Sequence, residues 1–121
     1  MTQMSNSSEI FHAKDGSHVP VLLKEVIQAL EIQDGNIFVD GTYGRGGYSQ
    51  AILEAKAGTQ VWGLDRDPEA IAHGKEMQHA YPGRFTILQG CFGAMEAVLS
   101  DHHVTSVDGI VLDVEIGRAH V

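Results

Sequence analysis

The stretch that decides the fold reads FVDGTYGRGGYS and runs from Phe38 to Ser49. An apolar segment leads into Asp40, a glycine-rich turn follows, and residues with helical character come after the turn. About twenty residues later, a second apolar segment ends in Asp65. A backbone turn that a ligand can approach closely, followed at this distance by a carboxylate, is how half of a nucleotide-binding α/β site is built. The stretch therefore predicts a half-site for a nucleotide-like ligand.

The composition is that of a single globular domain. The chain has 121 residues, of which 43% are hydrophobic, enough for one core of ordinary size. The one cysteine, Cys91, excludes an internal disulfide and fits a reducing compartment. No apolar run reaches the roughly 18 residues that a membrane span needs. The polar N-terminal residues lack the apolar core of a secretory signal. We therefore expect a cytoplasmic protein that does not enter a membrane.

The charge of the chain is strongly acidic. Eight Lys and Arg residues stand against sixteen Asp and Glu residues, which gives a formal net charge of −8. Proteins that hold nucleic acid mainly through its phosphates are normally basic. The charge therefore argues against this stretch gripping nucleic acid, while it is compatible with a catalytic half whose RNA-contacting surface lies elsewhere.

Predicted strands and helices alternate along the chain. The expected strands are residues 36–40, 60–65, 84–89 and 106–113, and the expected helices are residues 18–30, 48–55, 67–79 and 94–99. This alternation is typical of a parallel sheet with right-handed crossovers. We therefore predict an α/β fold with a doubly wound parallel sheet. Residues 1–17 are small and polar, and we expect them to form a disordered tail.

Carboxylates end three of the four predicted strands, namely Asp40, Asp65 and Asp113. Ligands of open α/β sheets bind beyond the carboxyl ends of the strands. The glycines of the turn can adopt positive φ, and the N–H groups that begin the next helix can bind an anion. A tight turn without a ligand is the alternative, but four glycines within seven residues exceed what a turn needs.

The residues near the other strand ends suggest further roles. Asp65 is a candidate acceptor for two ribose hydroxyls, because Asp67 is available to cap the next helix. The ring of Phe92 could stack on adenine or pack in the core. We interpret Cys91 as a small buried residue rather than a nucleophile. The histidines lack the i, i+4 spacing of a zinc pair, so we predict no metal site and interpret them as surface residues.

Two ligands compete for the half-site, NAD and S-adenosylmethionine. NAD favours a complete G-x-G-x-x-G pattern, but here Ser49 occupies the third glycine position. S-adenosylmethionine has no pyrophosphate, and its ammonium and sulfonium suit the acidic Asp40 beside the turn. The residues therefore favour the methyl donor. An NAD-dependent oxidoreductase and a non-catalytic nucleotide-binding module stay open as alternatives.

Five motifs follow one another between residues 18 and 114. They read HVPVLL (18–23), VDGTYGRGGYS (39–49), LDRDPEAI (64–71), RF (84–85) and VDGIVLD (107–113). In this order and spacing they resemble the MraW family of ribosomal RNA small subunit methyltransferases. The resemblance implies a class I, Rossmann-like methyltransferase that depends on S-adenosylmethionine. It also implies the substrate, the exocyclic N4 of a cytidine in the decoding region of 16S rRNA.

The resemblance further implies the roles of particular residues. Those implied to bind the donor are Gly46, Gly47 and Tyr48 at its methionine end, Asp65 at its ribose, and Phe92 and Asp113 along the adenine and the methyl-transfer mouth. The family usually has His at position 48, and a contact through the backbone would survive the change to Tyr. Asp113 is also the candidate catalytic residue, because a carboxylate can accept hydrogen bonds from the cytosine amine.

The resemblance also sets the expected extent of the domain. The family fold usually has seven strands, so we expect residues 18–114 to form an incomplete sheet, the first four strands and the N-terminal half of the methyltransferase domain. We expect such a fragment alone to be poorly stable and inactive. The last residues, EIGRAHV (115–121), depart from the family pattern. Because they are also the translation of a common sequencing adapter, we expect residues 115–121 to be non-native.

Overall fold

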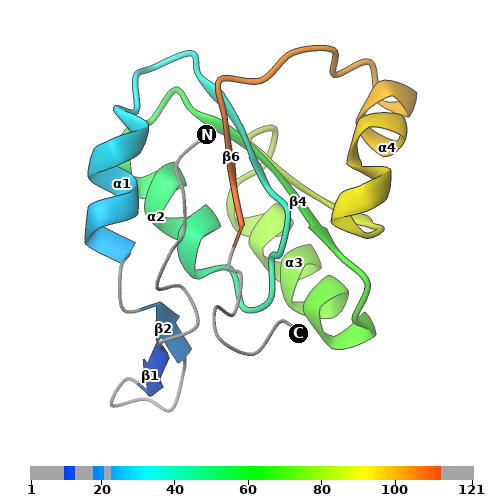
Figure 1. Cartoon of the computed structure of the whole chain (residues 1–121), viewed down its shortest axis with the longest axis horizontal. Coiled ribbons are helices and arrows are strands. Elements are labelled where there is room, and N and C mark those ends of the chain that lie inside the picture. The colour runs from blue at the N-terminus through cyan, green and yellow to red at the C-terminus, as the bar shows by residue number, and fades with distance from the viewer. Residues whose placement is uncertain (1–9, 13–17, 21–22, 113–121) are drawn as a thin grey trace.

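A four-stranded parallel sheet forms the centre of the molecule (Figure 1). The structure is a computed structural model, and it describes residues 10–12, 18–20 and 23–112. The strands are β3 (Ile37–Asp40), β4 (Gln60–Asp65), β5 (Phe85–Gln89) and β6 (Gly109–Val111), in the order β5-β4-β3-β6. All neighbouring pairs are parallel, which confirms the predicted α/β fold with four strands.

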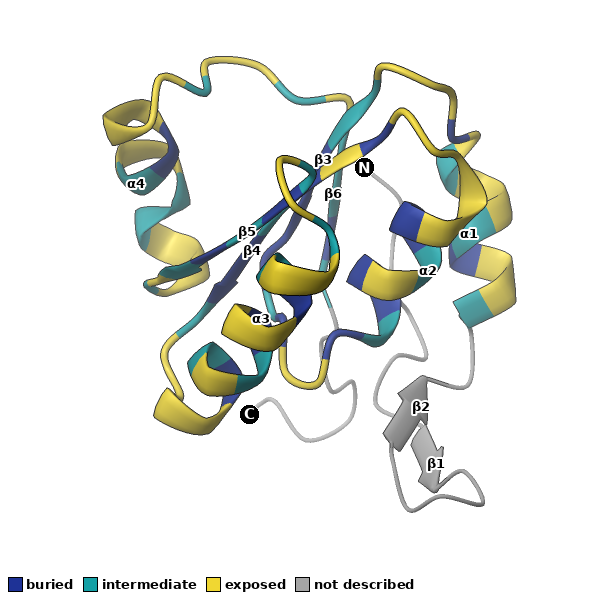
Figure 2. Cartoon of the chain, turned by 180° about the vertical axis from the view of Figure 1, so that it is seen from behind, coloured by how far each residue is buried: buried dark blue, intermediate teal, exposed yellow. Residues whose placement is uncertain are grey.

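Helices cover both faces of this sheet (Figures 1 and 2). They are α1 (Leu23–Leu30), α2 (Gly47–Ala55), α3 (Pro68–Ala80) and α4 (Met95–Asp101), the last preceded by a 3-10 turn, Phe92–Ala94. α1, α2 and α3 lie on one face and α4 on the other. The larger core lies under the first three helices and includes Phe38, Ile52, Val61 and Phe85. The smaller core, centred on Val39, Leu64 and Leu99, lies under α4.

The chain begins differently from the sequence prediction. Strand β1 (Ile10–His12) pairs antiparallel with β2 (His18–Pro20), so β2 occupies the expected start of the first helix. Helix α1 begins only at Leu23. Proline disfavours the helical conformation in the residue before it, which explains why the chain is extended as it enters Pro20. β1 lies within residues 1–17, the segment whose composition predicted no regular structure.

The strand order reverses between β3 and β6. From β3 the chain moves outward to β4 and β5, and it then crosses over through α4 to pair β6 with the other side of β3. The carboxyl ends of β3 and β6 meet at this switch, where Asp40 is in register with Val111. Crevices at such switch points are the usual ligand sites of open α/β sheets. Among the described helices, none is long and apolar enough to cross a membrane.

Candidate functional site

The glycine turn joins β3 to α2 in a shape that other residues rarely adopt. Gly44 and Gly46 both have positive φ, 56° and 81°, as predicted. A Cβ on Gly46 would lie 2.6 Å from the hydroxyl oxygen of Tyr43, so the backbone also approaches that side chain too closely for any larger residue. Gly47 is instead the first residue of α2. The turn therefore exposes Gly44 and Arg45 and buries Gly46 at the start of a helix.

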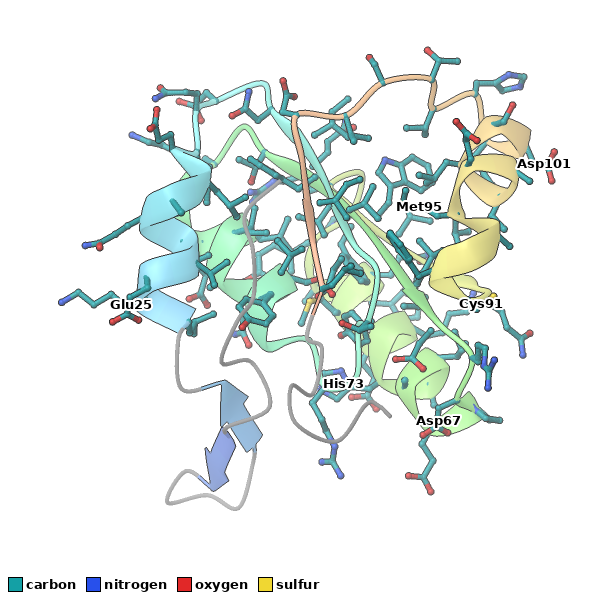
Figure 3. The ribbon with its side chains drawn as sticks, viewed as in Figure 1. Glu25, Asp67, His73, Cys91, Met95 and Asp101 are labelled. Carbon is teal, nitrogen blue, oxygen red and sulfur yellow. The ribbon has the colours of Figure 1, made fainter. Side chains whose placement is uncertain are left out.

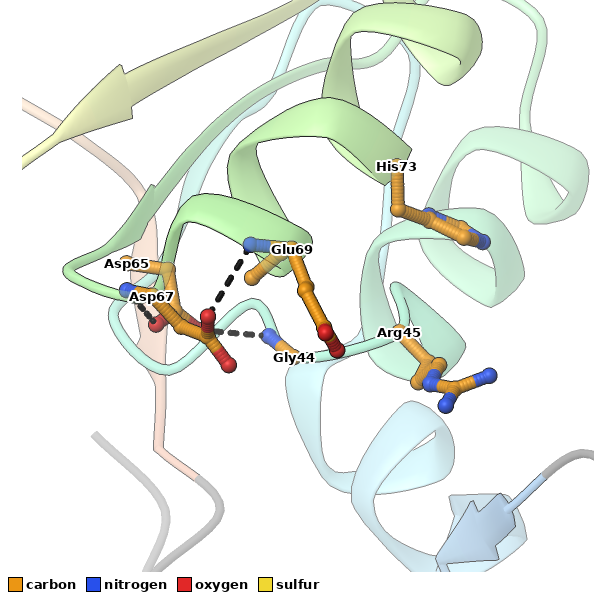
Figure 4. A pocket seen from close by; sticks show the side chains of 7 residues that line it. Gly44, Arg45, Asp65, Asp67, Glu69 and His73 are labelled. Carbon is orange, nitrogen blue, oxygen red and sulfur yellow. Dashed lines mark hydrogen bonds between the residues drawn. The ribbon is translucent and has the colours of Figure 1, made fainter.

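Asp65, at the end of β4, holds this turn in place (Figure 4). Its Oδ2 accepts a hydrogen bond from the amide of Gly44 at 2.8 Å, and its Oδ1 accepts one from the amide of Asp67 at 3.0 Å. Asp67 in turn caps α3, because its Oδ1 accepts the amide of Glu69 at 2.9 Å, as predicted. A carboxylate has about four acceptor positions, so Asp65 can still receive two further donors.

A hollow of about 250 Å³ lies at the ends of β3, β4 and β5. Its lining residues are Gly41, Thr42, Asp65, Arg66, Gly90, Cys91 and Phe92. The structure therefore brings together two predicted site residues, the Asp65 carboxylate and the Phe92 ring. Phe92 is 44% exposed, an unusual state for so large an apolar side chain. Cys91 is exposed as well, so the prediction of a buried cysteine was wrong (Figure 3).

A second hollow, of about 400 Å³, lies on the α3 side of Asp65 (Figure 4). Its lining residues are Gly44, Arg45, Asp65, Asp67, Glu69, Ala70 and His73. Asp65 therefore separates the two hollows and lines both. Across the described part of the chain, no group of three or more His, Cys, Asp or Glu side chains is arranged to hold a metal ion.

Asp40 is a structural residue of the turn rather than part of a hollow. Its side chain is completely buried. Oδ2 accepts a hydrogen bond from the hydroxyl of Ser49 at 2.8 Å, and Oδ1 accepts one from the amide of Thr42 at 3.3 Å. Asp40 thus joins the end of β3 to the first turn of α2. The sequence predicted that this carboxylate suits a cationic ligand. Because the carboxylate is buried, it would attract such a ligand through its electric field rather than by contact.

The other predicted residues of the turn contribute backbone more than side chain. The side chain of Tyr48 is 2% exposed and belongs to the larger core, so only its backbone at the start of α2 lies near the turn. Gly46 caps the same helix end. Asp113, the remaining predicted site residue, lies outside the described residues.

Sequence reasoning missed the partnership of Tyr43 and His73. The Tyr43 hydroxyl oxygen lies 2.8 Å from Nδ1 of His73 and 3.7 Å from the sulfur of Met77, both on α3. Burial raises the pKa of Tyr43 well above its usual value, and the nearby Asp40 and Glu76 charges raise it further. His73 is therefore more than the surface residue that its spacing indicated. A contact between residues thirty positions apart leaves no local signal in a sequence.

The strand order, the glycine turn and the carboxylate after the second strand define a Rossmann-like α/β domain, and two solved structures share this fold. A precorrin 8W decarboxylase from Methanobacterium thermoautotrophicum matches with a TM-score of 0.59 and 20% identity, over 91% of this chain and 57% of that one. A precorrin-6y C5,15-methyltransferase from Geobacter metallireducens matches with a TM-score of 0.56 and 16% identity, over 86% and 67%. At such identities the likeness concerns the fold alone.

Sequence comparison identifies the family. A model of the MraW methylase family matches residues 15–121, so the chain belongs to this family. A ribosomal RNA small subunit methyltransferase H from Rhodospirillum centenum is 48% identical over 104 residues, which cover 86% of this chain and 31% of that protein. The protein of the same name from Granulibacter bethesdensis is 46% identical over 110 residues, 91% of this chain and 33% of that one. The chain thus spans about a third of these relatives.

Proposed function

We propose that this chain forms the part of an rRNA methyltransferase that binds the methyl donor, S-adenosylmethionine. The proposed product carries a methyl group on N4 of a cytidine in the decoding region of 16S rRNA. The observation that carries the proposal is the hollow beside the glycine turn, where the Asp65 carboxylate and the exposed Phe92 ring meet at the ends of adjacent strands. Membership of the MraW methylase family and the names of the relatives support the reaction and the rRNA substrate.

The residues around this hollow fit the donor. Asp65 has acceptor positions left for two neighbouring ribose hydroxyls, and Phe92 offers an apolar face to adenine. Gly46, Gly47 and Tyr48 lie at the start of α2, whose first amides can bind the carboxylate at the methionine end of the donor. When bound, the donor supplies an electrophilic methyl group. The protein's task is then to hold the two reactants in line.

Ser49 favours the methyl donor over NAD. In the dinucleotide fingerprint a third glycine lets the helix pack closely against the strand. Here that position is a serine whose hydroxyl is bound to the buried Asp40. Replacing Ser49 by glycine would leave a buried carboxylate without this donor. The turn is thus built around a serine and an internal carboxylate rather than around a pyrophosphate.

Asp113 is the proposed catalytic residue. The amino nitrogen of cytosine is a weak nucleophile, because its lone pair is delocalised into the ring. A carboxylate that accepts hydrogen bonds from this amine would orient it and draw on its protons. Asp113 follows β6 by two residues, and β6 ends in register with Asp40 at the switch point. This position along the chain supports a place near the transferred methyl group.

The donor site is tested with Asp65→Asn in a protein of full family length that carries this sequence. Charge-assisted hydrogen bonds to the ribose would be lost, so we expect the dissociation constant for S-adenosylmethionine to rise roughly 10- to 100-fold in isothermal titration calorimetry. The matched control is Asp67→Asn, because asparagine caps a helix as well as aspartate does. Equal losses in the two variants, or tighter binding of NAD than of S-adenosylmethionine, would refute the proposed donor site.

A further inference from the structure

The Tyr43 side chain lies directly beneath the glycine turn. A Cβ on Gly46 would lie 2.6 Å from the Tyr43 hydroxyl oxygen, and a Cβ on Gly63 of β4 would lie 3.0 Å from Cδ1 of the Tyr43 ring. The backbone of the same residue is fixed as well: its amide donates to the carbonyl of Leu64 at 2.9 Å, and its carbonyl accepts the amide of Gly46 at 2.8 Å. A movement of the Tyr43 ring would therefore move the turn.

Helix α3 holds the outer end of this ring. His73 Nδ1 lies 2.8 Å from the hydroxyl oxygen, and the two rings are 5.6 Å apart between centroids. His73 is half-buried and also lines the larger hollow, beside Gly44 and Arg45 of the turn (Figure 4). The side chains of Tyr43 and His73 thus connect the glycine turn to α3. They act in addition to the Asp65 carboxylate, which accepts hydrogen bonds from backbone amides.

We propose that Tyr43 and His73 are positioning residues, which hold the glycine turn in the conformation that receives the methyl donor. The inference rests on the proposed function for its ligand. The positioning role itself does not depend on the proposed function, because the hydrogen bond and the close packing exist without a donor. Neither side chain needs to touch the ligand, since both act through the backbone of Gly46 and its neighbours.

The geometry lets this contact persist in either tautomer of His73. The Tyr43 hydroxyl has one proton and two possible acceptors, His73 Nδ1 and the Met77 sulfur. When His73 Nδ1 carries no proton, the hydroxyl can donate to it. When His73 Nδ1 carries a proton, it can donate to the hydroxyl oxygen, and the hydroxyl can donate to Met77. Phenylalanine at position 43 would keep the ring and lose both hydrogen bonds.

Hydrogen exchange on the intact protein tests the positioning role. The variants are Tyr43→Phe and His73→Ala, with His73→Asn as the conservative change, because an asparagine side chain places a polar atom near the position of Nδ1. His79→Ala, at an exposed position later on α3, is the matched control. We expect exchange of the Gly44 and Gly46 amides to rise roughly 3- to 10-fold in the first two variants, as for the loss of one hydrogen bond. The Val61 amide in β4 should change less, and His73→Asn should restore most of the protection.

Donor affinity then separates positioning from direct contact. Opening of the turn only reduces the fraction of protein that can bind, so the dissociation constant for S-adenosylmethionine should rise by no more than the increase in exchange, and by very little where the turn is closed in most molecules. Unchanged exchange at the turn would overturn the inference, whereas raised exchange with little change in affinity supports it. A larger loss of affinity than of protection would mean direct contact, which also overturns it. If the unsubstituted protein of full family length binds no S-adenosylmethionine, the proposed function fails. The exchange result still decides whether Tyr43 and His73 hold the turn.

Discussion

At the scale of single residues, Arg84 connects the end of one element to the start of another. Its guanidinium donates hydrogen bonds to the carbonyls of Leu53 at 2.7 Å, Lys56 at 2.9 Å and Thr59 at 2.9 Å, and it lies 5.6 Å from the centroid of the Tyr81 ring. The last carbonyls of a helix have no partner within the helix. Arg84 supplies such partners at the end of α2 and fixes the chain as it enters β4.

Replacing Arg84 by lysine should destabilise the protein. One ammonium group cannot reproduce the planar fork that reaches three carbonyls, so we expect the free energy of unfolding to fall by about 1–3 kcal/mol in urea titrations. Arg66→Lys is the matched control, because Arg66 is exposed. Surface substitutions of that kind usually stay within about 0.5 kcal/mol. Equal stability of the two variants would contradict the bridging role of Arg84.

Single residues also show how far sequence reasoning reaches. The positive φ of Gly44 and the helix cap at Asp67 follow from local chemistry, and both are present in the structure. The roles of His73 and Arg84 depend on partners that only the tertiary fold brings near. Asp65 combines the two cases. Its place at a strand end was predictable, but its hydrogen bond to the glycine turn was not.

At the scale of elements, helix α3 packs on β5 at the distance that a glycine allows. A Cβ on Gly74 would lie 2.5 Å from Cγ1 of Ile87 and 2.7 Å from its Cβ. Gly74 is buried in the middle of the helix, where glycine is normally unfavourable. Close packing of α3 on the sheet is therefore the reason for a residue that helix propensity alone would exclude.

The variant Gly74→Ala tests this packing. Alanine improves helix propensity by about 1 kcal/mol, but overpacking against Ile87 costs typically 1–3 kcal/mol. We therefore expect a net loss of stability, seen as a lower urea midpoint. Lys75→Ala, at the next and exposed position, should change little. A rise in the midpoint of Gly74→Ala would show that α3 can move away from β5 without cost, contrary to this account.

The boundaries of helices and strands were predicted well where the sequence pattern is local. They were predicted poorly where a side chain takes the place of a backbone group in the hydrogen bonding. β4 matches its predicted range, and β5 and α3 start one residue later than predicted. β6 starts three residues later than predicted, at Gly109, because Asp108 changes the ladder at its start. Its backbone amide donates to the carbonyl of Ile37 at 2.7 Å, while its side chain accepts the amide of Ile37 at 2.8 Å. A carboxylate thus takes the place of a backbone carbonyl, and the regular strand begins at Gly109.

At the scale of the whole molecule, the charge and the topology favour a separation between the proposed donor site and the proposed RNA contacts. The chain has a formal net charge of −8, which would repel the phosphates of an RNA. The proposed donor site lies at the carboxyl ends of the strands, and its lining includes only one basic side chain, Arg66. In the described residues, β6 pairs only with β3 and forms one edge of the sheet. We therefore propose that the main RNA contacts lie outside the described residues.

This separation makes a prediction for Asp113. In a protein of full family length, Asp113→Asn should lower the turnover number roughly 100- to 10,000-fold, the usual range for a group that assists proton transfer. The KM for small ribosomal subunits should stay within a few-fold, because the main RNA contacts lie elsewhere. Steady-state methyl transfer at varied subunit concentration measures both. A raised KM with normal turnover would mean that Asp113 binds RNA and has no catalytic role.

The two hydrogen bonds that the Asp65 carboxylate accepts from backbone amides have a consequence for the thermodynamics of binding. A carboxylate on the surface usually samples several rotamers, and a ligand that needs one of them must restrict the side chain. Asp65 is already restricted, because the amides of Gly44 and Asp67 hold one oxygen each. Its conformational entropy is therefore lost when the protein folds. Hydrogen bonds that a ligand then makes with Asp65 contribute to affinity with little loss of side-chain entropy on binding.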